Sequence, residues 1–391
     1  MRLIPPLLAL ALLLPAAPTL AQGCGGPFAA FLDGLRTEAR TRGIDGAVAD
    51  SFLRGARQDD RVLRADRAQG IFRAEFADFA RRLISADRMA NGRRNHDRYR
   101  AVFDRALREY GVPPGILLAF WAFETDFGGF QGDYNTRDAL VTLAHDCRRP
   151  ELFRPQVFAG MVLHGRGQFD PATTTGAWAG EIGQVQMLPS DILDRAVDGD
   201  GDGRIDLKGS APDALLSGAN MLKGFGWRAG EPWLIEVAVP DTLDWGRTGL
   251  RTELPVAEWQ RLGVRARDGR LPAGLRASVL VPQGRRGPAF MVFPNFRVLF
   301  EWNQSFVYVL TTAYFATRLE GAPVFDPRDP EPGLSPDEMR ELQRRLNARG
   351  YDTGGVTGIL GARTRAAVQD AQRTLGLPAD AWPTRALLAR L

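Results

Sequence analysis

Residues 111–132, GVPPGILLAFWAFETDFGGFQG, decide the fold because they predict one fully buried helix. Pro113 and Pro114 suit a loop followed by a first helical turn, and the glycines at 128–129 supply the stop. Between these signals, residues 116–123 are apolar on every face. A helix without a polar stripe is buried, so we expect this helix at the centre of the core.

Glu124 follows the apolar run directly, at the C-terminal end of the predicted helix. Desolvation and the negative end of the helix dipole both disfavour a carboxylate there, so we expect its pKa to rise towards the range that a general acid needs. The spacing alone leaves open that Glu124 is a solvent-facing residue beside the glycine stop. Asp126 and Asp133 are rival carboxylates nearby.

The N-terminus predicts a secretory signal rather than part of the fold. Residues 1–21 contain Arg2, a Leu/Ala-rich run and small residues before an expected cut after residue 21. We therefore expect an exported, periplasmic protein. No other stretch has the roughly eighteen uninterrupted apolar residues of a membrane span, so none is predicted.

The chain has two cysteines, Cys24 and Cys147. In an oxidising compartment an even pair favours a disulfide. Lipid anchoring through Cys24 is the less favoured alternative, because the residues before it fit a lipoprotein cleavage site poorly. Two cysteines and three scattered histidines do not form a zinc site or a catalytic triad.

The composition is that of a globular chain. With 391 residues, 45% hydrophobic and 25% charged, it is large enough for two or more domains. The net charge is +4, and nearly all of the 50 basic residues are arginines scattered along the chain. No block of like charge alternates with aromatic residues, so nucleic acid is not an expected partner, whereas an anionic polymer such as cell wall is compatible.

Apolar residues at helical spacing predict that the N-terminal third is helical, with helices at 28–43, 45–56, 65–83 and 87–110. Two short apolar runs, 277–281 and 289–293, flank a Gln-Gly-Arg-Arg-Gly turn and predict a β-hairpin. Helical character returns at 295–320. The predicted fold is therefore mainly α with a small β element.

Two further stretches carry candidate binding residues. In residues 176–189, GAWAGEIGQVQMLP, the amides of Gln184 and Gln186 suit a sugar-binding cleft, although ordinary loop hydrogen bonding is the alternative. Asn303 and Tyr308 lie in a polar and aromatic part of the later helical region, where a core role is the alternative.

Residues 196–207, AVDGDGDGRIDL, resemble an EF-hand cation loop. Three acids alternate with glycines there: Asp198, Asp200 and Asp202. The twelfth position is Gly209 rather than the usual Glu, so Asp213 is the candidate for the empty place. A plain Asp-Gly turn is the alternative.

Residues 321–334, GAPVFDPRDPEPGL, are proline-rich and typical of a semi-rigid linker. The unit that follows, 335–391, is expected to hold helices at 336–349, 362–375 and 384–390. Because so small a unit has no catalytic constellation, we expect a binding module that the linker keeps apart from the catalytic residues.

These motifs together resemble a known family. FETDFG after YGVPP, then GEIGQVQMLPS, AVDGDGDGRIDL and WNQSFVY, occur in the order and spacing of the membrane-bound lytic transglycosylase B family of murein-cleaving enzymes. Residues 335–391, with LQRRLNARGY, GILGARTRAAVQDAQ and LGLPAD, resemble the common three-helix peptidoglycan-binding domain.

The resemblance implies a lysozyme-like, α-rich catalytic domain over residues 22–320 that cleaves the MurNAc–GlcNAc β-1,4 bond of peptidoglycan without water and leaves a 1,6-anhydro-MurNAc end. Glu124 would be the single acid/base, with no cofactor for catalysis. The implied substrate-cleft residues are Gln186, Asn303 and Tyr308. The implied ligands of a structural Ca²⁺ are Asp198, Asp200, Asp202, the backbone carbonyl of Arg204, and Asp213.

The chain departs from the family pattern at two positions. Ala177 stands where relatives often have a cleft serine, and Thr357 stands where the binding module usually has Asp. Neither change touches Glu124.

The sequence offers no second motif-placed carboxylate, so we expect the substrate's own 2-acetamido group to assist, in place of two-carboxylate hydrolysis. Two alternatives stay open: a hydrolytic muramidase, which would form reducing ends, and a catalytically silent wall-binding protein. Besides peptidoglycan, wall-synthesis proteins are candidate partners.

Overall fold

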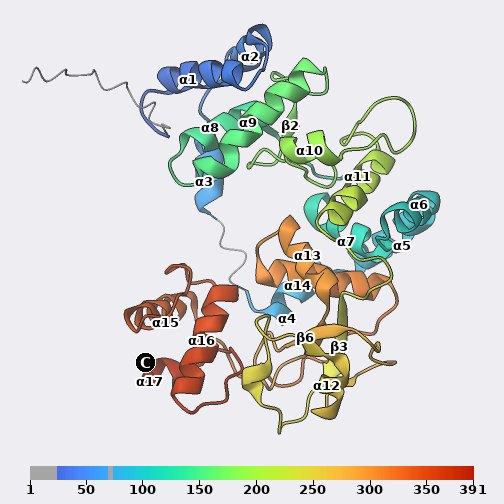
Figure 1. Ribbon diagram of the computed structural model, residues 1–391, viewed down its shortest axis with the longest axis vertical. Helices are drawn as coiled ribbons and strands as arrows, with labels where there is room; N and C mark the ends of the chain where they lie inside the picture. The colour runs from blue at the N-terminus through green and yellow to red at the C-terminus, as the bar shows by residue number, and fades with distance from the viewer. Residues whose placement is uncertain (1–23, 69–73) are drawn as a thin grey trace, which may run out of the picture.

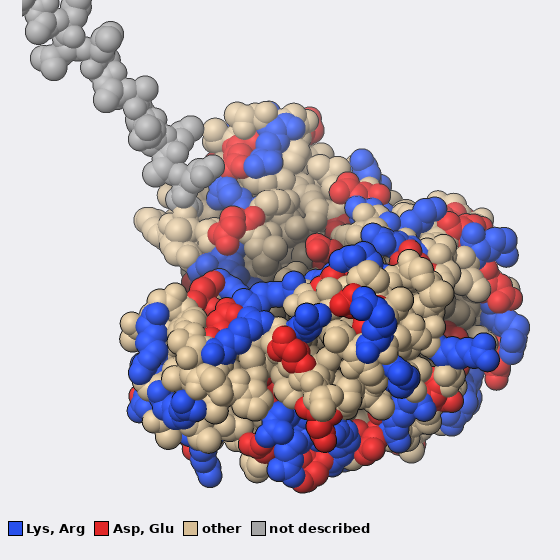
Figure 2. All heavy atoms as spheres, turned by 60° about the horizontal axis from the view of Figure 1, so that its bottom comes forward, with Lys and Arg blue, Asp and Glu red and all other residues tan. Residues whose placement is uncertain are grey.

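The computed structural model describes residues 24–68 and 74–391. The predicted secretory signal, residues 1–21, lies outside the described residues. Within the described part, no helix is both long enough and apolar enough to cross a membrane. On the face drawn in Figure 2, basic and acidic side chains are interspersed.

Helices build most of the described chain before residue 321, and Figure 1 shows them arranged around α7, with the sheet at the bottom of the view. The helices before the sheet are α1 (Phe28–Thr41), α2 (Gly46–Leu53), α3 (Asp60–Arg67), α4 (Phe76–Leu83), α5 (Ala86–Arg98), α6 (Arg100–Tyr110), α7 (Pro114–Thr125), α8 (Thr136–His145), α9 (Pro150–Gly165), α10 (Pro189–Arg195) and α11 (Ala211–Gly224). Two helices follow the sheet: α13 (Pro294–Trp302) and α14 (Phe306–Leu319).

Helix α7 is the buried helix that the sequence predicts. Its residues from Gly115 to Ala122 are all buried, and it packs against α14, α5, α6 and α11. At its start, the N–H of Gly115 donates to Oε1 of Glu320 at 2.7 Å, so one of the unpaired helix donors is satisfied. A Cβ at Gly115 would lie 2.6 Å from the carbonyl oxygen of Ala316, so α7 and α14 approach too closely for a larger residue.

Three predicted helices are each two helices in the structure. The stretch 65–83 contains the end of α3 and all of α4, and 87–110 divides between α5 and α6 at Tyr99, without a glycine or proline to signal the break. In 295–320 the chain leaves the helix at Asn303, whose backbone is extended. It starts again after Ser305, because the Ser305 hydroxyl accepts the N–H of Tyr308 and caps α14.

The predicted hairpin is present, but it belongs to a larger sheet. Strands β6 (Arg276–Leu280) and β7 (Phe290–Val292) pair antiparallel, with Ser278 opposite Val292. The full order is β4-β6-β7-β3-β5. The other elements are β3 (Leu234–Ala238), the 3-10 helix η2 (Trp245–Arg247), β4 (Leu254–Pro255), α12 (Val256–Arg261) and β5 (Arg265–Ala266). Strands β4 and β5 have only two residues each, too few for an alternating pattern to appear in the sequence.

The C-terminal unit has three helices with their own small core. They are α15 (Pro336–Ala348), α16 (Ala362–Thr374) and α17 (Arg385–Arg390). Ser335 and Glu338 form a reciprocal capping box that starts α15. Leu342 and Val368 are fully buried in the core between the helices.

The expectation that a spacer keeps this unit apart from the catalytic region is wrong. Gln369 of α16 is buried and its Nε2 donates to the carbonyl oxygens of Trp245 at 3.3 Å and Thr248 at 2.8 Å. Arg251 forms two hydrogen bonds with the carboxylate of Asp370, at 2.7 and 2.6 Å. The module is therefore docked on the region beside the sheet, as Figure 1 shows.

The segment 321–334 is itself hydrogen bonded both to the N-terminal part of the chain, through Glu75, and to the C-terminal unit, through Trp382. The N–H of Gly333 donates to Oε1 of Glu75 at 3.0 Å, and Trp382 Nε1 donates to the carbonyl oxygen of Glu331 at 2.9 Å. Its proline-rich composition predicts a free spacer. That prediction fails because composition does not reveal contacts with residues so distant in sequence.

A disulfide joins Cys24 to Cys147, which are 123 residues apart with Cα atoms 5.0 Å from each other. It ties the start of the described chain to the connection between α8 and α9. A sulfur held in a disulfide cannot carry a lipid, so this pairing and the alternative of lipid anchoring exclude each other.

The two remaining strands lie within the helical region. β1 (Tyr134–Asn135) pairs antiparallel with β2 (Thr175–Gly176), with Tyr134 opposite Gly176. This short pair places the loop after β2 close to the end of α7, where Glu124 lies.

Candidate active site

Glu124 lies on the last turn of α7, partly exposed, at the wall of a cleft of about 760 Å³. The cleft is lined by the loop that contains Ala177 and Gln186, and by the break between α13 and α14. Residues Ile359 to Gly361 of the C-terminal module also line it. The cleft is therefore shared between the N-terminal part of the chain and the module.

The surroundings of Glu124 make it a weak acid. The pKa of Glu124 is raised to about 7, chiefly by burial; the hydrogen bond from Tyr308 opposes the rise, the negative charge of Glu181 adds to it, and a hydrogen bond from the Trp302 side chain opposes it. The Tyr308 hydroxyl donates to Oε1 of Glu124 at 2.5 Å. The predicted rise in pKa is confirmed, and at neutral pH both the acid and the carboxylate are accessible, as a group that gives and takes a proton requires.

The end of α7 is fixed to the loop beneath the cleft. Asp126 and Phe127 both have positive φ, 51° and 61°, which ends the helix after Thr125, one residue beyond Glu124. The Thr125 hydroxyl donates to the carbonyl oxygen of Gln184 at 2.6 Å, and Trp121 Nε1 donates to Oε1 of the same residue at 2.9 Å. Gln184 is thus a buried structural contact, which is the alternative that the sequence left open for it.

The structure places the three expected substrate residues differently. Gln186 and Asn303 both line the cleft. Gln186 Nε2 donates to the carbonyl oxygen of Gly183 at 2.8 Å, so its amide is oriented by the loop. Tyr308 is buried and contacts Glu124 instead of facing the cleft.

The rival carboxylates lie outside this arrangement. Asp126 is exposed and pairs with Arg88, whose Nε is 3.1 Å from Oδ1. Asp133 is also exposed. Neither is among the residues that line the cleft around Glu124.

Glu181 is the functional candidate that our sequence reasoning missed. It lines the same cleft as Glu124, and burial raises its pKa to about 7. Its Oε2 is buried and has no hydrogen-bond partner. The available signal was a single acid inside the apolar, glycine-rich GEIG segment, because burying a charge in such a segment costs free energy unless the charge is paired or has a function.

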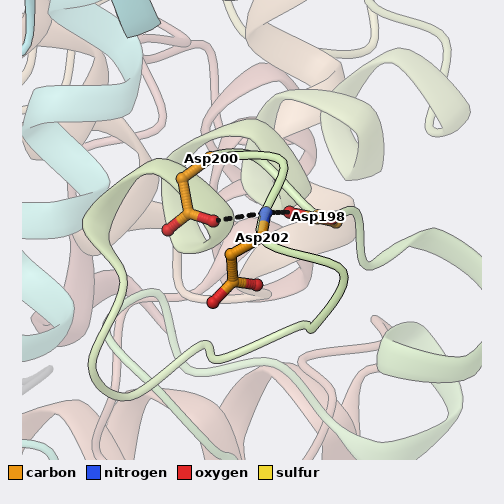
Figure 3. Close-up of side chains that lie close together, drawn as sticks. All are labelled: Asp198, Asp200 and Asp202. Atoms are coloured by element: carbon orange, nitrogen blue, oxygen red, sulfur yellow. Dashed lines mark hydrogen bonds between the residues drawn. The ribbon is translucent and has the colours of Figure 1, made fainter.

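The predicted cation loop brings three carboxylates together. Figure 3 shows Asp198, Asp200 and Asp202, and one carboxylate oxygen from each lies within 4.8 Å of the others. The N–H of Asp202 lies between its neighbours, 3.2 Å from Oδ1 of Asp198 and 3.2 Å from Oδ1 of Asp200. Clustered carboxylate oxygens are the ligands that Ca²⁺ prefers, so the residues present fit the predicted ion.

Asp213, the expected distal ligand, is not grouped with these three. It is buried and accepts backbone N–H groups from Gly199 at 2.7 Å, Asp200 at 3.3 Å and Asp206 at 2.7 Å. In the structure it therefore holds the loop backbone in place. Arg204, whose carbonyl is the remaining expected ligand, donates its N–H to Oδ1 of Asp202 at 2.8 Å.

The two departures from the family pattern have simple structural settings. Ala177 closes a tight turn, where its N–H donates to the carbonyl oxygen of Glu181 at 3.0 Å. The Thr357 hydroxyl accepts the N–H of Ile359 at 3.2 Å. Because an Asp side chain also caps turns by accepting a nearby N–H, Thr357 keeps that role in the module.

Comparisons with known proteins match both parts of the chain. Residues 27–317 match the transglycosylase SLT domain, and residues 335–391 match a putative peptidoglycan binding domain. Membrane-bound lytic murein transglycosylase B of Escherichia coli K12 is 29% identical over 236 residues, which are 59% of this chain and 64% of that protein. The chain thus spans just under two thirds of the length of that relative.

Solved structures extend the similarity to the whole arrangement. SltB3 from Pseudomonas aeruginosa, in complex with NAG-anhNAM-pentapeptide, is 37% identical and covers 94% of this chain and 99% of its own, with a TM-score of 0.84. The E. coli transglycosylase SLT35 in complex with calcium is 27% identical, covers 78% of this chain and 97% of its own, and has a TM-score of 0.65. With a matched domain over residues 27–317 and this fold, the chain belongs to the SLT transglycosylase family and carries a C-terminal peptidoglycan-binding domain.

Proposed function

We propose that this protein is a lytic transglycosylase that cleaves the MurNAc–GlcNAc β-1,4 bond of peptidoglycan and leaves a 1,6-anhydro-MurNAc end. The observation that carries the proposal is Glu124, an acid with a pKa of about 7 on the wall of a cleft of about 760 Å³. The complex of the relative SltB3 with NAG-anhNAM-pentapeptide supports the substrate class and the form of the product.

In the proposed mechanism Glu124 is the single acid/base. Protonated Glu124 donates to the glycosidic oxygen as the bond to the anomeric carbon breaks, and the 2-acetamido group stabilises the positive charge that develops there. Glu124, now a carboxylate, takes the proton of the C6 hydroxyl as that oxygen bonds to the anomeric carbon. The proton returns to Glu124 and no water is consumed.

Tyr308 has a clear part in this cycle. Its hydroxyl donates to Oε1 of Glu124, and such a bond favours the charged form of a carboxylate. It therefore stabilises Glu124 after the first proton transfer and opposes the effect of burial. The Trp302 side chain, which also hydrogen bonds Glu124, acts in the same direction.

The experiment that tests the function is mass spectrometry of sacculi digested by the purified protein. We expect products that are lighter by one water than those of a hydrolytic muramidase. Digestion in water enriched in heavy oxygen is the control, because only hydrolysis places that oxygen in the new sugar end.

Hydrolysis is the second candidate, and one observation favours it: Glu181 is a second carboxyl group on the same cleft. Two-carboxylate glycosidases use such a partner to activate water or to attack the anomeric carbon. Incorporation of heavy oxygen into the product would select this candidate over the lytic reaction. A wall-binding protein without activity would release no soluble fragments in the same assay.

We also propose a structural Ca²⁺ in the loop after α10, held by Asp198, Asp200, Asp202 and the carbonyl oxygen of Arg204, with Asp213 supporting the loop from below. The three clustered carboxylates and the calcium complex of the relative SLT35 support this site. The ion would stiffen the loop and takes no part in the bond cleavage.

The proposed setting is the periplasm, reached through the signal at residues 1–21. There the C-terminal module would bind the sacculus and hold the shared cleft against its polymer, and wall-synthesis proteins are candidate further partners. The disulfide of Cys24 with Cys147 suits that oxidising compartment.

A further inference from the structure

Glu181 lies at the end of a tight turn that faces the cleft. The turn begins at Ala177, whose N–H donates to the carbonyl oxygen of Glu181, and a Cβ on Gly176 would lie 1.9 Å from that oxygen. Both Ala177 and Glu181 line the cleft. Of the two residues that close the turn, only Glu181 can hydrogen bond to a ligand through its side chain.

The carboxyl group of Glu181 has two unequal sides. Oε2 is buried without a hydrogen-bond partner, whereas the residue as a whole is partly exposed and lines the cleft. The negative charge of a carboxylate is spread over both oxygens, so burying Oε2 without a hydrogen bond destabilises the charged form. Burial accordingly raises the pKa of Glu181 to about 7. A neutral carboxyl carries one O–H donor, and the open side available to that donor is the cleft.

The charged groups nearby do not reverse this preference. Hydrogen bonds from the backbone of Glu181 and Ala179, and then the positive charge of Arg149 before α9, favour the carboxylate form of Glu181, but burial outweighs them. Glu124 on α7 and Asp191 on α10 line the same cleft and oppose a further negative charge. Tyr308 on α14 donates to Glu124.

We propose that Glu181 binds the glycan as a neutral acid, by donating its O–H to the carbonyl oxygen of an N-acetyl group. The inference rests on the proposed function, since it takes the N-acetylated glycan of peptidoglycan as the ligand. Amide carbonyl oxygens are stronger acceptors than the hydroxyls of a sugar. The hydrogen bond orients the sugar beside Glu124, and no proton is transferred from Glu181.

The test separates hydrogen-bond donation from charge. Glu181→Gln keeps an N–H donor of the same size, whereas Glu181→Met removes the donor. Glu301→Met is the matched control, because Glu301 lines the same cleft but is exposed. Each change is made in the full chain together with Glu124→Gln, and the binding of a purified GlcNAc-MurNAc-peptide is measured by calorimetry.

We expect Glu181→Met to weaken binding about tenfold, the size of one lost hydrogen bond. Glu181→Gln should stay within about threefold of the parent, and the Glu301 control should not change. Binding by the parent should weaken as pH rises through about 7, where Glu181 loses its proton, whereas binding by the Gln variant should not.

Three results would overturn the assignment. One is unchanged binding by Glu181→Met, and another is a pH response that is the same in the parent and the Gln variant. The third is a loss of turnover beyond a hundredfold in Glu181→Gln with Glu124 intact, because Glu181 would then act as a charged base. Absence of any binding by the parent would reject the proposed function itself, so the two failures are distinguishable.

Discussion

The cleft and the cation loop both gather acidic side chains, but they treat the charge in opposite ways. Glu124 and Glu181 are partly buried in the cleft wall, and burial is the main cause that raises the pKa of each to about 7. Asp198 accepts N–H groups from Gly203, Gly201 and Asp202, and these hydrogen bonds lower its pKa. Burial thus outweighs the hydrogen bonds at the two glutamates, whereas three backbone donors outweigh burial at Asp198, and this balance decides whether a carboxylate carries a proton or remains an anion that can hold a cation.

The largest expected effect, a loss of cleavage activity, comes from removing the transferable proton of Glu124 in the cleft. Glu124→Gln replaces the acid by a neutral group of the same shape, so we expect cleavage of sacculi to fall by more than about a hundredfold. Folding and sedimentation with sacculi should be unchanged. Asp126→Asn, two residues further along and exposed, is the control and should keep full activity. Residual activity above one hundredth in the Gln variant would mean that another group is the acid.

The next effect lies at the base of the cation loop. Asp213→Asn presents an amide to one of the three N–H groups that Asp213 accepts, which should lower the free energy of unfolding by about 2 to 3 kcal/mol. The exposed Asp202→Asn should change it by less than about 0.5 kcal/mol. Urea unfolding in the presence of EDTA measures both. Equal effects in the two variants would contradict the structural role of Asp213.

A smaller effect concerns the pH dependence of kcat/KM, which two variants should shift in opposite directions. Cleavage needs protonated Glu124, so kcat/KM should fall as pH rises through about 7. Tyr308→Phe removes a hydrogen bond that lowers the pKa of Glu124 and should move this limb to higher pH. Glu181 becomes charged as pH rises through about 7 and that charge raises the pKa of Glu124, so Glu181→Gln should move this limb to lower pH. Each shift should be up to about one unit, and shifts of the same sign would refute this account.

The smallest effect is that of calcium on the loop. If the ion is bound with a dissociation constant of about 0.1 to 1 mM, 1 mM calcium adds roughly 1 kcal/mol to the free energy of unfolding by mass action. For a chain of this size the melting temperature should rise by about one to three degrees. A variant with both Asp200→Ala and Asp202→Ala should show no rise. The same rise in that variant would place the ion elsewhere.

Glu124 could be predicted from the sequence because its signal is local. An uninterrupted apolar run between a proline start and a glycine stop fixes both the burial of α7 and the place of the acid at its end. The three alternating aspartates were equally local, and the structure clusters them.

Glu181 and Tyr308 could not be placed in the same way, because their roles depend on contacts across the fold. Tyr308 meets Glu124 only because α14 packs along α7, and the two residues are 184 positions apart. Glu181 reaches the cleft because a two-residue strand pair holds its loop against the end of α7. Sequence periodicity carries no information on such pairings.

The docked C-terminal module has a consequence for protein engineering. Grafting a foreign wall-binding module after residue 334 would leave the carbonyl oxygens of Trp245 and Thr248 without the amide of Gln369, and Arg251 without Asp370. The graft would also remove Leu360 from the cleft wall. The two parts therefore cannot be exchanged as independent cassettes, and a chimaera would have to carry the contact surface beside the sheet together with its module.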